Sequence, residues 1–214
     1  MRLIMVGPQG AGKGTQGGRL AERHAIPHVA TGDLLRAEVR QGTSLGLKAR
    51  EFMGRGDLVP DDLVMRMLER RLSQPDAADG FVLDGFPRNA PQAEALDRVL
   101  ARAEQGLDAV VSLEVPDEVL VERLSARRTC PTCGRPYTQV GGLPVTCEDD
   151  GTELVHRADD TPEAIRRRLA IFHEHTVPLI AFYEKRDLVL HVDGVGSVDE
   201  VETRIVKELE ARTS

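Results

Sequence analysis

Short apolar segments alternate along the chain with longer amphipathic segments. Continuous apolar runs are typical of strands that are covered on both faces, as in parallel sheets. Such runs predict five strands, at 2–6, 28–30, 81–86, 109–115 and 188–192. Helical spacing predicts helices at 15–23, 33–40, 45–53, 62–72, 91–103, 118–127 and 162–174. Asn89 and Thr161 are predicted to cap the helices at 91–103 and 162–174, and a capping box formed by Ser197 and Glu200 begins a last helix. This alternation predicts a doubly wound α/β fold with a parallel five-stranded sheet flanked by helices.

Two regions interrupt the alternation. Residues 31–60 have helical patterns with no strong strand between them, and residues 128–160 are rich in Gly, Pro, Thr and Cys, as in a small β-lobe. We therefore expect one core domain, formed by residues 1–30, 61–127 and 161–214, that carries two inserted lobes.

Composition narrows the classes of function. The apolar run near the N-terminus, residues 3–6, is too short for a signal peptide, and no segment approaches the ~20 apolar residues that span a bilayer. These features predict a cytoplasmic protein with no membrane partner, in which cysteines would stay reduced and serve metal or redox chemistry. The net charge of −7 argues against a nucleic-acid partner, because a phosphate backbone requires a basic surface.

A glycine-rich segment, GPQGAGKG at 7–14, lies between a predicted strand and a predicted helix. It matches the P-loop pattern as far as Lys13, and in such loops backbone N–H groups and the lysine surround phosphate oxygens. Gly14 stands where most P-loops have the Ser or Thr that binds magnesium, and Thr15 follows one position later. A turn without a ligand is disfavoured by this context, but the loop alone leaves the phosphoryl acceptor open.

Four motifs occur in this order along the chain: GPQGAGKGTQ (7–16), TGDLLR (31–36), DGFPRNAPQ (84–92) and HRADDTPEAIRRRL (156–169). Together they resemble the adenylate kinase family in its long bacterial form, and the resemblance covers nearly the whole chain. It implies reversible phosphoryl transfer from ATP to AMP, giving two ADP, by a monomeric enzyme that uses ATP, AMP and ADP as partners and Mg²⁺ brought by ATP. Residues 31–60 would be the lobe that binds the monophosphate, and 128–160 the lid.

The resemblance also implies three sets of site residues. The catalytic set is Lys13, Asp84, Arg88, Arg127, Arg157 and Arg168. The ATP-binding set is Gly10, Ala11, Gly12, Lys13, Gly14, Thr15, Arg123, Arg127, Pro136, Tyr137 and Gly196. The AMP-binding set is Thr31, Arg36, Asp57, Leu58, Val59, Gly85, Phe86, Pro87, Arg88, Gln92, Arg157 and Arg168, with Thr31 and Gln92 expected to contact adenine.

The chemistry of this acceptor accounts for the many arginines and for the lack of an evident base. The attacking phosphate oxygen is already largely ionised, because its second pKa is ~6. Catalysis mainly requires cations that hold two polyanions in line, and a lid that excludes water. Asp84 is expected to orient waters on magnesium. Asp159 and Asp160 are expected at the lid hinge and in interlobe pairing, with an exposed acidic turn as the alternative.

Three cysteines fall in the predicted lid. Cys130 and Cys133 enclose two residues, and Cys147 and Asp150 repeat that spacing, which makes Asp150 the expected fourth ligand of a zinc ion. Zinc-bearing members of the family resemble this pattern with Cys or Asp at that position. All four ligands would come from the protein, so the zinc would be structural and would stabilise a lobe too small for a core of its own.

Several alternatives stay open on the sequence. The fourth ligand could instead be Asp149 or His156, and the cysteines could be unrelated buried thiols or a redox pair. The acceptor could be UMP or CMP, as in related kinases. A zinc-ribbon nucleic-acid binder with a P-loop motor is disfavoured, because Arg135 is the one basic residue between 130 and 153. A nucleotide sensor without turnover would not need arginines on both sides of the phosphates.

Overall fold

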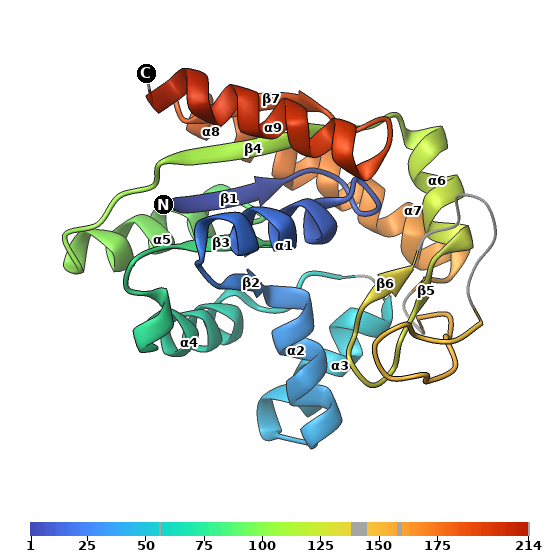
Figure 1. Cartoon of the computed structure of the whole chain (residues 1–214). Coiled ribbons are helices and arrows are strands. Elements are labelled where there is room, and N and C mark those ends of the chain that lie inside the picture. The colour runs from blue at the N-terminus through green and yellow to red at the C-terminus, as the bar shows by residue number, and fades with distance from the viewer. Residues whose placement is uncertain (56, 138–144, 158–159, 214) are drawn as a thin grey trace.

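The computed structural model describes residues 1–55, 57–137, 145–157 and 160–213. Its centre is a parallel sheet with the strand order β2-β3-β1-β4-β7 (Figure 1). The strands are β1 (Arg2–Val6), β2 (His28–Ala30), β3 (Phe81–Asp84), β4 (Ala109–Glu114) and β7 (Val189–Asp193). The five predicted strands and the α/β fold class are therefore confirmed.

Helices cover both faces of this sheet. In chain order they are α1 (Lys13–His24), α2 (Thr31–Gln41), α3 (Ser44–Arg55), α4 (Asp61–Leu72), α5 (Ala90–Arg102), α6 (Asp117–Ala126), α7 (Pro162–Ile171), α8 (Val177–Glu184) and α9 (Val198–Thr213). Because side chains alternate along a strand, β1 supplies two cores. Leu3 and Met5 pack with apolar residues of α1 and α9, whereas Ile4 and Val6 pack with those of α4, α5 and α8.

Predicted capping residues set the starts of three helices. Asn89 accepts the backbone N–H of Gln92 at 2.9 Å, and Thr161 accepts that of Ala164 at 3.2 Å. Ser197 and Glu200 exchange the two bonds of a capping box, at 2.8 and 3.3 Å. These contacts are local in sequence, which is why the sequence could predict them.

The predicted end of one helix at residue 174 is wrong. After α7 the backbone widens into a π-turn at Phe172–Thr176 and then continues as α8, with Pro178 in its first turn. Proline has no N–H to donate to the preceding turn, and a change of helical register at that point accommodates it.

Two small units extend from the layered core (Figure 1). The helices α2 and α3 lie within the predicted monophosphate lobe and project below the sheet in that view. The strands β5 (Arg128–Thr129) and β6 (Pro136–Tyr137) form an antiparallel pair, and Cys130, Tyr137, Cys147 and Leu154 form a small buried cluster beside it. The division into a core and two lobes that move separately stays a prediction.

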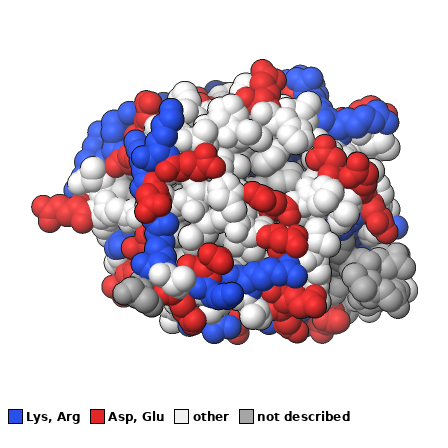
Figure 2. Space-filling model, turned by 90° about the horizontal axis from the view of Figure 1, so that it is seen from above, with Lys and Arg blue, Asp and Glu red and all other residues white. Residues whose placement is uncertain are grey.

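The surface carries charges of both signs. On the face drawn in Figure 2, acidic and basic side chains are interspersed, and the described part of that face shows no continuous basic surface. Within the described ranges, no helix has the length and apolar character needed to cross a membrane.

Candidate active site

The loop between β1 and α1 has the conformation of a phosphate-binding loop. Gly7, Gly10 and Gly12 have φ values of 146°, 87° and 94°, which residues with a side chain rarely adopt. The N-terminus of α1 begins directly at Lys13, so its unpaired N–H groups and the positive end of the helix dipole face the loop. The ammonium group of Lys13 folds back over the loop and donates to the carbonyl of Pro8 at 2.8 Å.

Lys13 lies in a strongly cationic environment. The pKa of its ammonium group is lowered from 10.5 to about 8, chiefly by burial. Asp84 opposes this shift, and repulsion from the guanidinium groups of Arg88, Arg127 and Arg168 contributes to it. The four cations come from four different elements or loops, yet they act on one another in a single site. A bound polyanion would relieve this repulsion.

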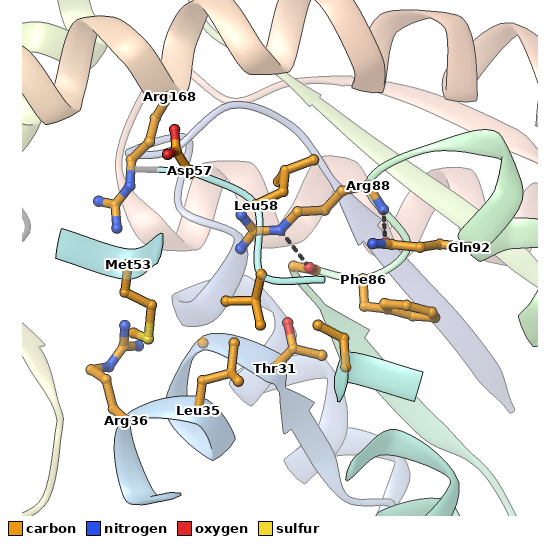
Figure 3. A pocket seen from close by; sticks show the side chains of 14 residues that line it. Thr31, Leu35, Arg36, Met53, Asp57, Leu58, Phe86, Arg88, Gln92 and Arg168 are labelled. Atoms are coloured by element: carbon orange, nitrogen blue, oxygen red, sulfur yellow. Dashed lines mark hydrogen bonds between the residues drawn. The ribbon is translucent and has the colours of Figure 1, made fainter. Parts of the chain in front are cut away.

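Beside the P-loop lies a cavity that contains about 530 Å³ of empty space. It is lined by every predicted AMP-binding residue except Pro87 and Arg157, together with Gly32, Leu35, Met53 and Val64. In Figure 3 the side chains of Arg36, Arg88 and Arg168 extend from different elements toward the same space. The structure thus brings together residues that are far apart in the sequence.

Arg88 is at the centre of this cavity (Figure 3). Its side chain donates to the carbonyl of Gly85 at 2.8 Å, and its backbone N–H donates to the side chain of Gln92 at 2.7 Å. Burial, and then the charges of Arg168 and Arg36, lower the pKa of the Arg88 guanidinium, with Asp84 opposing them. These three arginines therefore share one anion site.

The two residues expected to contact adenine are both buried and hydrogen-bonded. Thr31 donates to the carbonyl of Asp84 at 3.1 Å, and Gln92 donates to Asp61 at 2.5 Å. The amide of Gln92 also accepts the backbone N–H of Arg88. One N–H and one lone pair of this amide remain for the predicted contact with adenine.

Sequence reasoning missed an ion pair at the edge of the cavity. Asp57 accepts from Arg55 at 3.1 Å and also pairs with Arg167 of α7, which is 110 residues away in the chain. Burial raises the pKa of the Asp57 carboxyl, but the bonds from Arg167 and Arg55 outweigh that effect, so its pKa lies below the usual value. Arg167 lies within the motif at 156–169, but nothing in that motif indicates a partner 110 residues away.

On the ATP side, Arg123 connects the P-loop to the turn before α9. Its guanidinium donates to the carbonyls of Gly10, at 3.4 Å, and Gly194, at 3.2 Å, two residues before Gly196. Tyr137 instead packs in the cysteine cluster, because its hydroxyl lies 3.3 Å from the Cys147 sulfur and its side chain is buried there. Pro136 lies beside it on β6.

Arg127 and Arg168 meet at Asp160, whose side chain has 0% exposure. The alternative of an exposed acidic turn is therefore wrong for Asp160, and Asp159 lies outside the described residues. Arg157 donates to Thr129 at 2.9 Å and is not among the residues that line the cavity.

Asp84 ends β3 next to the P-loop, and a Cβ added at Gly14 would lie 3.4 Å from its carboxylate. Nε2 of His28 lies 3.8 Å from this carboxylate. A single carboxylate at this place fits a magnesium ion that keeps most of its waters.

The predicted metal ligands also come together. Ligand atoms of Cys130, Cys133, Cys147 and Asp150 all lie within 4.8 Å of one another, and the Cys133 and Cys147 sulfurs are 3.6 Å apart. Tetrahedral zinc with Zn–S bonds of ~2.3 Å requires sulfurs about 3.8 Å apart, so the cluster fits. The alternative ligands have other partners: Asp149 accepts from Arg135 at 2.7 Å, and the ring of His156 lies 3.1 Å from Arg128.

A P-loop at the end of a parallel strand, next to an arginine-lined cavity that shares its cations, defines a kinase of nucleoside monophosphates. The sequence profile of the adenylate kinase family matches residues 5–188. Adenylate kinases of Xanthomonas euvesicatoria pv. vesicatoria and Thermodesulfovibrio yellowstonii are 50% identical over 209 residues and 47% identical over 218 residues. These alignments cover 98% and 99% of this chain and 99% and 100% of the relatives. The adenylate kinase of Lachnospira eligens is 45% identical over 98% of this chain and its own full length. The chain belongs to the adenylate kinase family.

Proposed function

We propose that the chain transfers a phosphoryl group reversibly from ATP to AMP, giving two ADP. The observation that carries the proposal is the cavity that adjoins the P-loop and shares its cations with Lys13. A site for one nucleotide needs a single set of phosphate-binding groups, whereas this site has the P-loop with Lys13 and, in the cavity, the further arginines Arg36, Arg88 and Arg168. Family membership supports the same reaction.

The proposed roles follow from position. Lys13 and Arg127 bind the phosphates of ATP, Arg36 and Arg88 hold the AMP phosphate, and Arg168 lies between the two groups. The attacking oxygen is already ionised, so the arginines need only neutralise the repulsion and hold the phosphates in line. Because they are preorganised by burial and hydrogen bonds, little reorganisation accompanies the transfer.

The remaining sequence-predicted roles belong to the same proposal. Lobes 31–60 and 128–160 close over the nucleotides, which brings Arg157 from the lid toward the transferred group and excludes water. Arg123, Pro136, Tyr137 and the turn at Gly196 complete the ATP site. Size-exclusion chromatography and cell fractionation test the monomeric state and the cytoplasmic location that the sequence predicts.

Two metals are part of the proposal. Asp84 would hold waters of the magnesium ion that accompanies ATP and that neutralises phosphate charge when bound. Cys130, Cys133, Cys147 and Asp150 would hold a structural zinc ion, because their spacing fits a closed four-ligand site. Metal analysis of the purified protein tests the zinc.

The decisive experiment is a coupled assay of ADP formation from ATP with AMP, UMP, CMP or GMP as acceptor. We expect AMP to give the highest kcat/KM, and Lys13→Met to lower turnover at least about a hundredfold while the protein still folds and melts cooperatively. A higher kcat/KM with UMP or CMP would overturn the adenine assignment. Turnover without any acceptor preference, or an active Lys13→Met, would overturn the assignment of the site.

A further inference from the structure

Asp61 is a carboxylate near the cavity to which the chemistry proposed above gives no role. It is the first residue of α4, and Asp62 follows it in the same turn. An acidic residue in the first turn of a helix is usually explained by its interaction with the helix dipole, and the exposed Asp62 fits that explanation. Asp61 is half-buried and has side-chain partners of its own, so these partners indicate what it does.

The main partner of Asp61 is the amide of Gln92, which lies beside Arg88 at the wall of the cavity (Figure 3). Nε2 of Gln92 donates to Oδ1 of Asp61 at 2.5 Å, although the two residues are 31 positions apart in the chain. At the other end of the amide, Oε1 accepts the backbone N–H of Arg88 at 2.7 Å. Because Gln92 is buried, water competes little for these bonds.

These two neighbours permit one orientation of the amide. A carboxylate accepts hydrogen bonds, and a backbone N–H donates them. If the amide turned over, its oxygen would face the carboxylate of Asp61 and its NH₂ group would face the N–H of Arg88. Both hydrogen bonds would be lost, and each would be replaced by a repulsive contact. The amide is therefore held with Oε1 toward Arg88 and Nε2 toward Asp61.

Asn89 joins the same network. Its side chain caps α5 by accepting the backbone N–H of Gln92 at 2.9 Å, and its Nδ2 lies 3.5 Å from Oδ2 of Asp61. The first turns of α4 and α5 are thus connected through a small set of polar side chains. This connection fixes the distance between Asp61 and the amide that it orients.

We infer that Asp61 is a positioning residue that makes the monophosphate site selective for a 6-amino purine over a 6-oxo purine. Gln92 keeps one N–H and one lone pair for a base. Adenine presents a donor at its 6-amino group and an acceptor at N1, whereas hypoxanthine presents an acceptor at O6 and a donor at N1. An amide that turned over freely would match either base, whereas an amide held in one orientation matches only one. The inference rests on the proposed contact between Gln92 and adenine.

The test is Asp61→Asn, assayed with ATP as donor and with AMP or inosine monophosphate (IMP), which carries hypoxanthine, as acceptor. Asparagine has the size of aspartate but both donates and accepts, so it satisfies either orientation of Gln92. We expect the ratio of kcat/KM for AMP to kcat/KM for IMP to fall about tenfold or more, mainly because the value for IMP rises. A residue that merely stabilised α4 would lower both values together and leave the ratio unchanged.

A double-mutant cycle with Gln92→Leu shows whether Asp61 acts through the amide. In the Gln92→Leu background, Asp61→Asn should change the ratio less than about twofold, because the group that it orients is gone. Asp62→Asn is the matched control, since it removes the same charge from the same helical turn, and it should leave the ratio at the wild-type value. If Asp61→Asn does not melt cooperatively, Asp61→Ser replaces it, because a hydroxyl also both donates and accepts, and the same fall is expected.

The outcomes separate this inference from the proposed function. If Gln92→Leu has the wild-type ratio, the proposed contact between Gln92 and adenine is wrong. If Gln92→Leu lowers the ratio but Asp61→Asn does not, or lowers it equally in both backgrounds, the positioning role of Asp61 is wrong. A wild-type enzyme that uses IMP as well as AMP would overturn the inference while leaving phosphoryl transfer to AMP in place.

Discussion

Raising the pH should inactivate the nucleotide-free enzyme through one group, the ammonium of Lys13. Burial and then three neighbouring guanidinium groups bring its pKa from 10.5 to about 8, although Asp84 opposes them. One pKa unit corresponds to about 1.4 kcal/mol, so the charged form is destabilised by about 3 kcal/mol. Phosphates placed among these cations would remove the repulsion and raise the pKa again.

The assay is the pH dependence of kcat/KM for ATP with AMP held well below its KM, compared with that of kcat at saturating ATP and AMP. Because kcat/KM reports the ionisation of the nucleotide-free site, it should decline from about pH 8, approaching tenfold per pH unit, while kcat stays level to higher pH. At pH 9, calorimetry in buffers of different ionisation enthalpy should show uptake of about one proton on binding of ATP.

The free energy of unfolding gives an independent measurement: raising the pH should increase it, whereas the same change should lower kcat/KM. The folded-state pKa of Lys13 lies below its unfolded value, so between pH 8 and 10.5 the unfolded chain binds more protons at this residue. The contribution of Lys13 to the free energy of unfolding should therefore increase with pH across that window, by up to about 3 kcal/mol. The difference in unfolding free energy between wild type and Lys13→Met isolates it.

Lys13→Arg is the control, because arginine stays charged at every pH used. Its residual kcat/KM should not decline between pH 8 and 10. A wild-type kcat/KM that is level to pH 10, or an equal decline in Lys13→Arg, would refute the reasoning.

Three further predictions concern other parts of the molecule. Asp150→Ala should lose zinc and melt at a lower temperature, with a modest change in turnover, whereas Asp150→Cys should keep the metal. Elemental analysis and thermal melts check this prediction, and a wild-type protein without metal would contradict it. Gly46→Ala should destabilise the protein by about 1–3 kcal/mol in urea unfolding and raise KM for AMP more than for ATP. The reason is that a Cβ at this position would overlap the backbone of Glu38, where α2 and α3 meet. Unchanged stability would contradict this prediction. Asp57→Asn should raise KM for AMP but alter stability by less than about 1 kcal/mol, because its partner Arg167 is mostly exposed; an unchanged KM for AMP would count against a role of this pair at the cavity.

Much of the fold was predictable because its signals are local. A buried strand needs only a short apolar run, and a helix cap needs only two residues three positions apart, so the strands and the caps at Asn89 and Thr161 were found from the sequence. The P-loop was equally local, since its glycines, lysine and flanking elements are contiguous. The continuation of the chain into α8 was missed because Pro178 is a local stop signal that a π-turn overrides.

The sequence by itself determined the strands, the phosphate loop, the arginine set and the repeated spacing that singled out Asp150. The tertiary structure alone decided which of these residues share a space: that Arg36, Arg88 and Arg168 line one cavity, and that Tyr137 is buried in the cysteine cluster. It also decided the pairing of Asp160 with Gln9 across 151 residues. Local patterns depend on the energies of neighbouring residues, whereas such contacts depend on how the sheet orders its strands, and that order is a property of the whole packed chain.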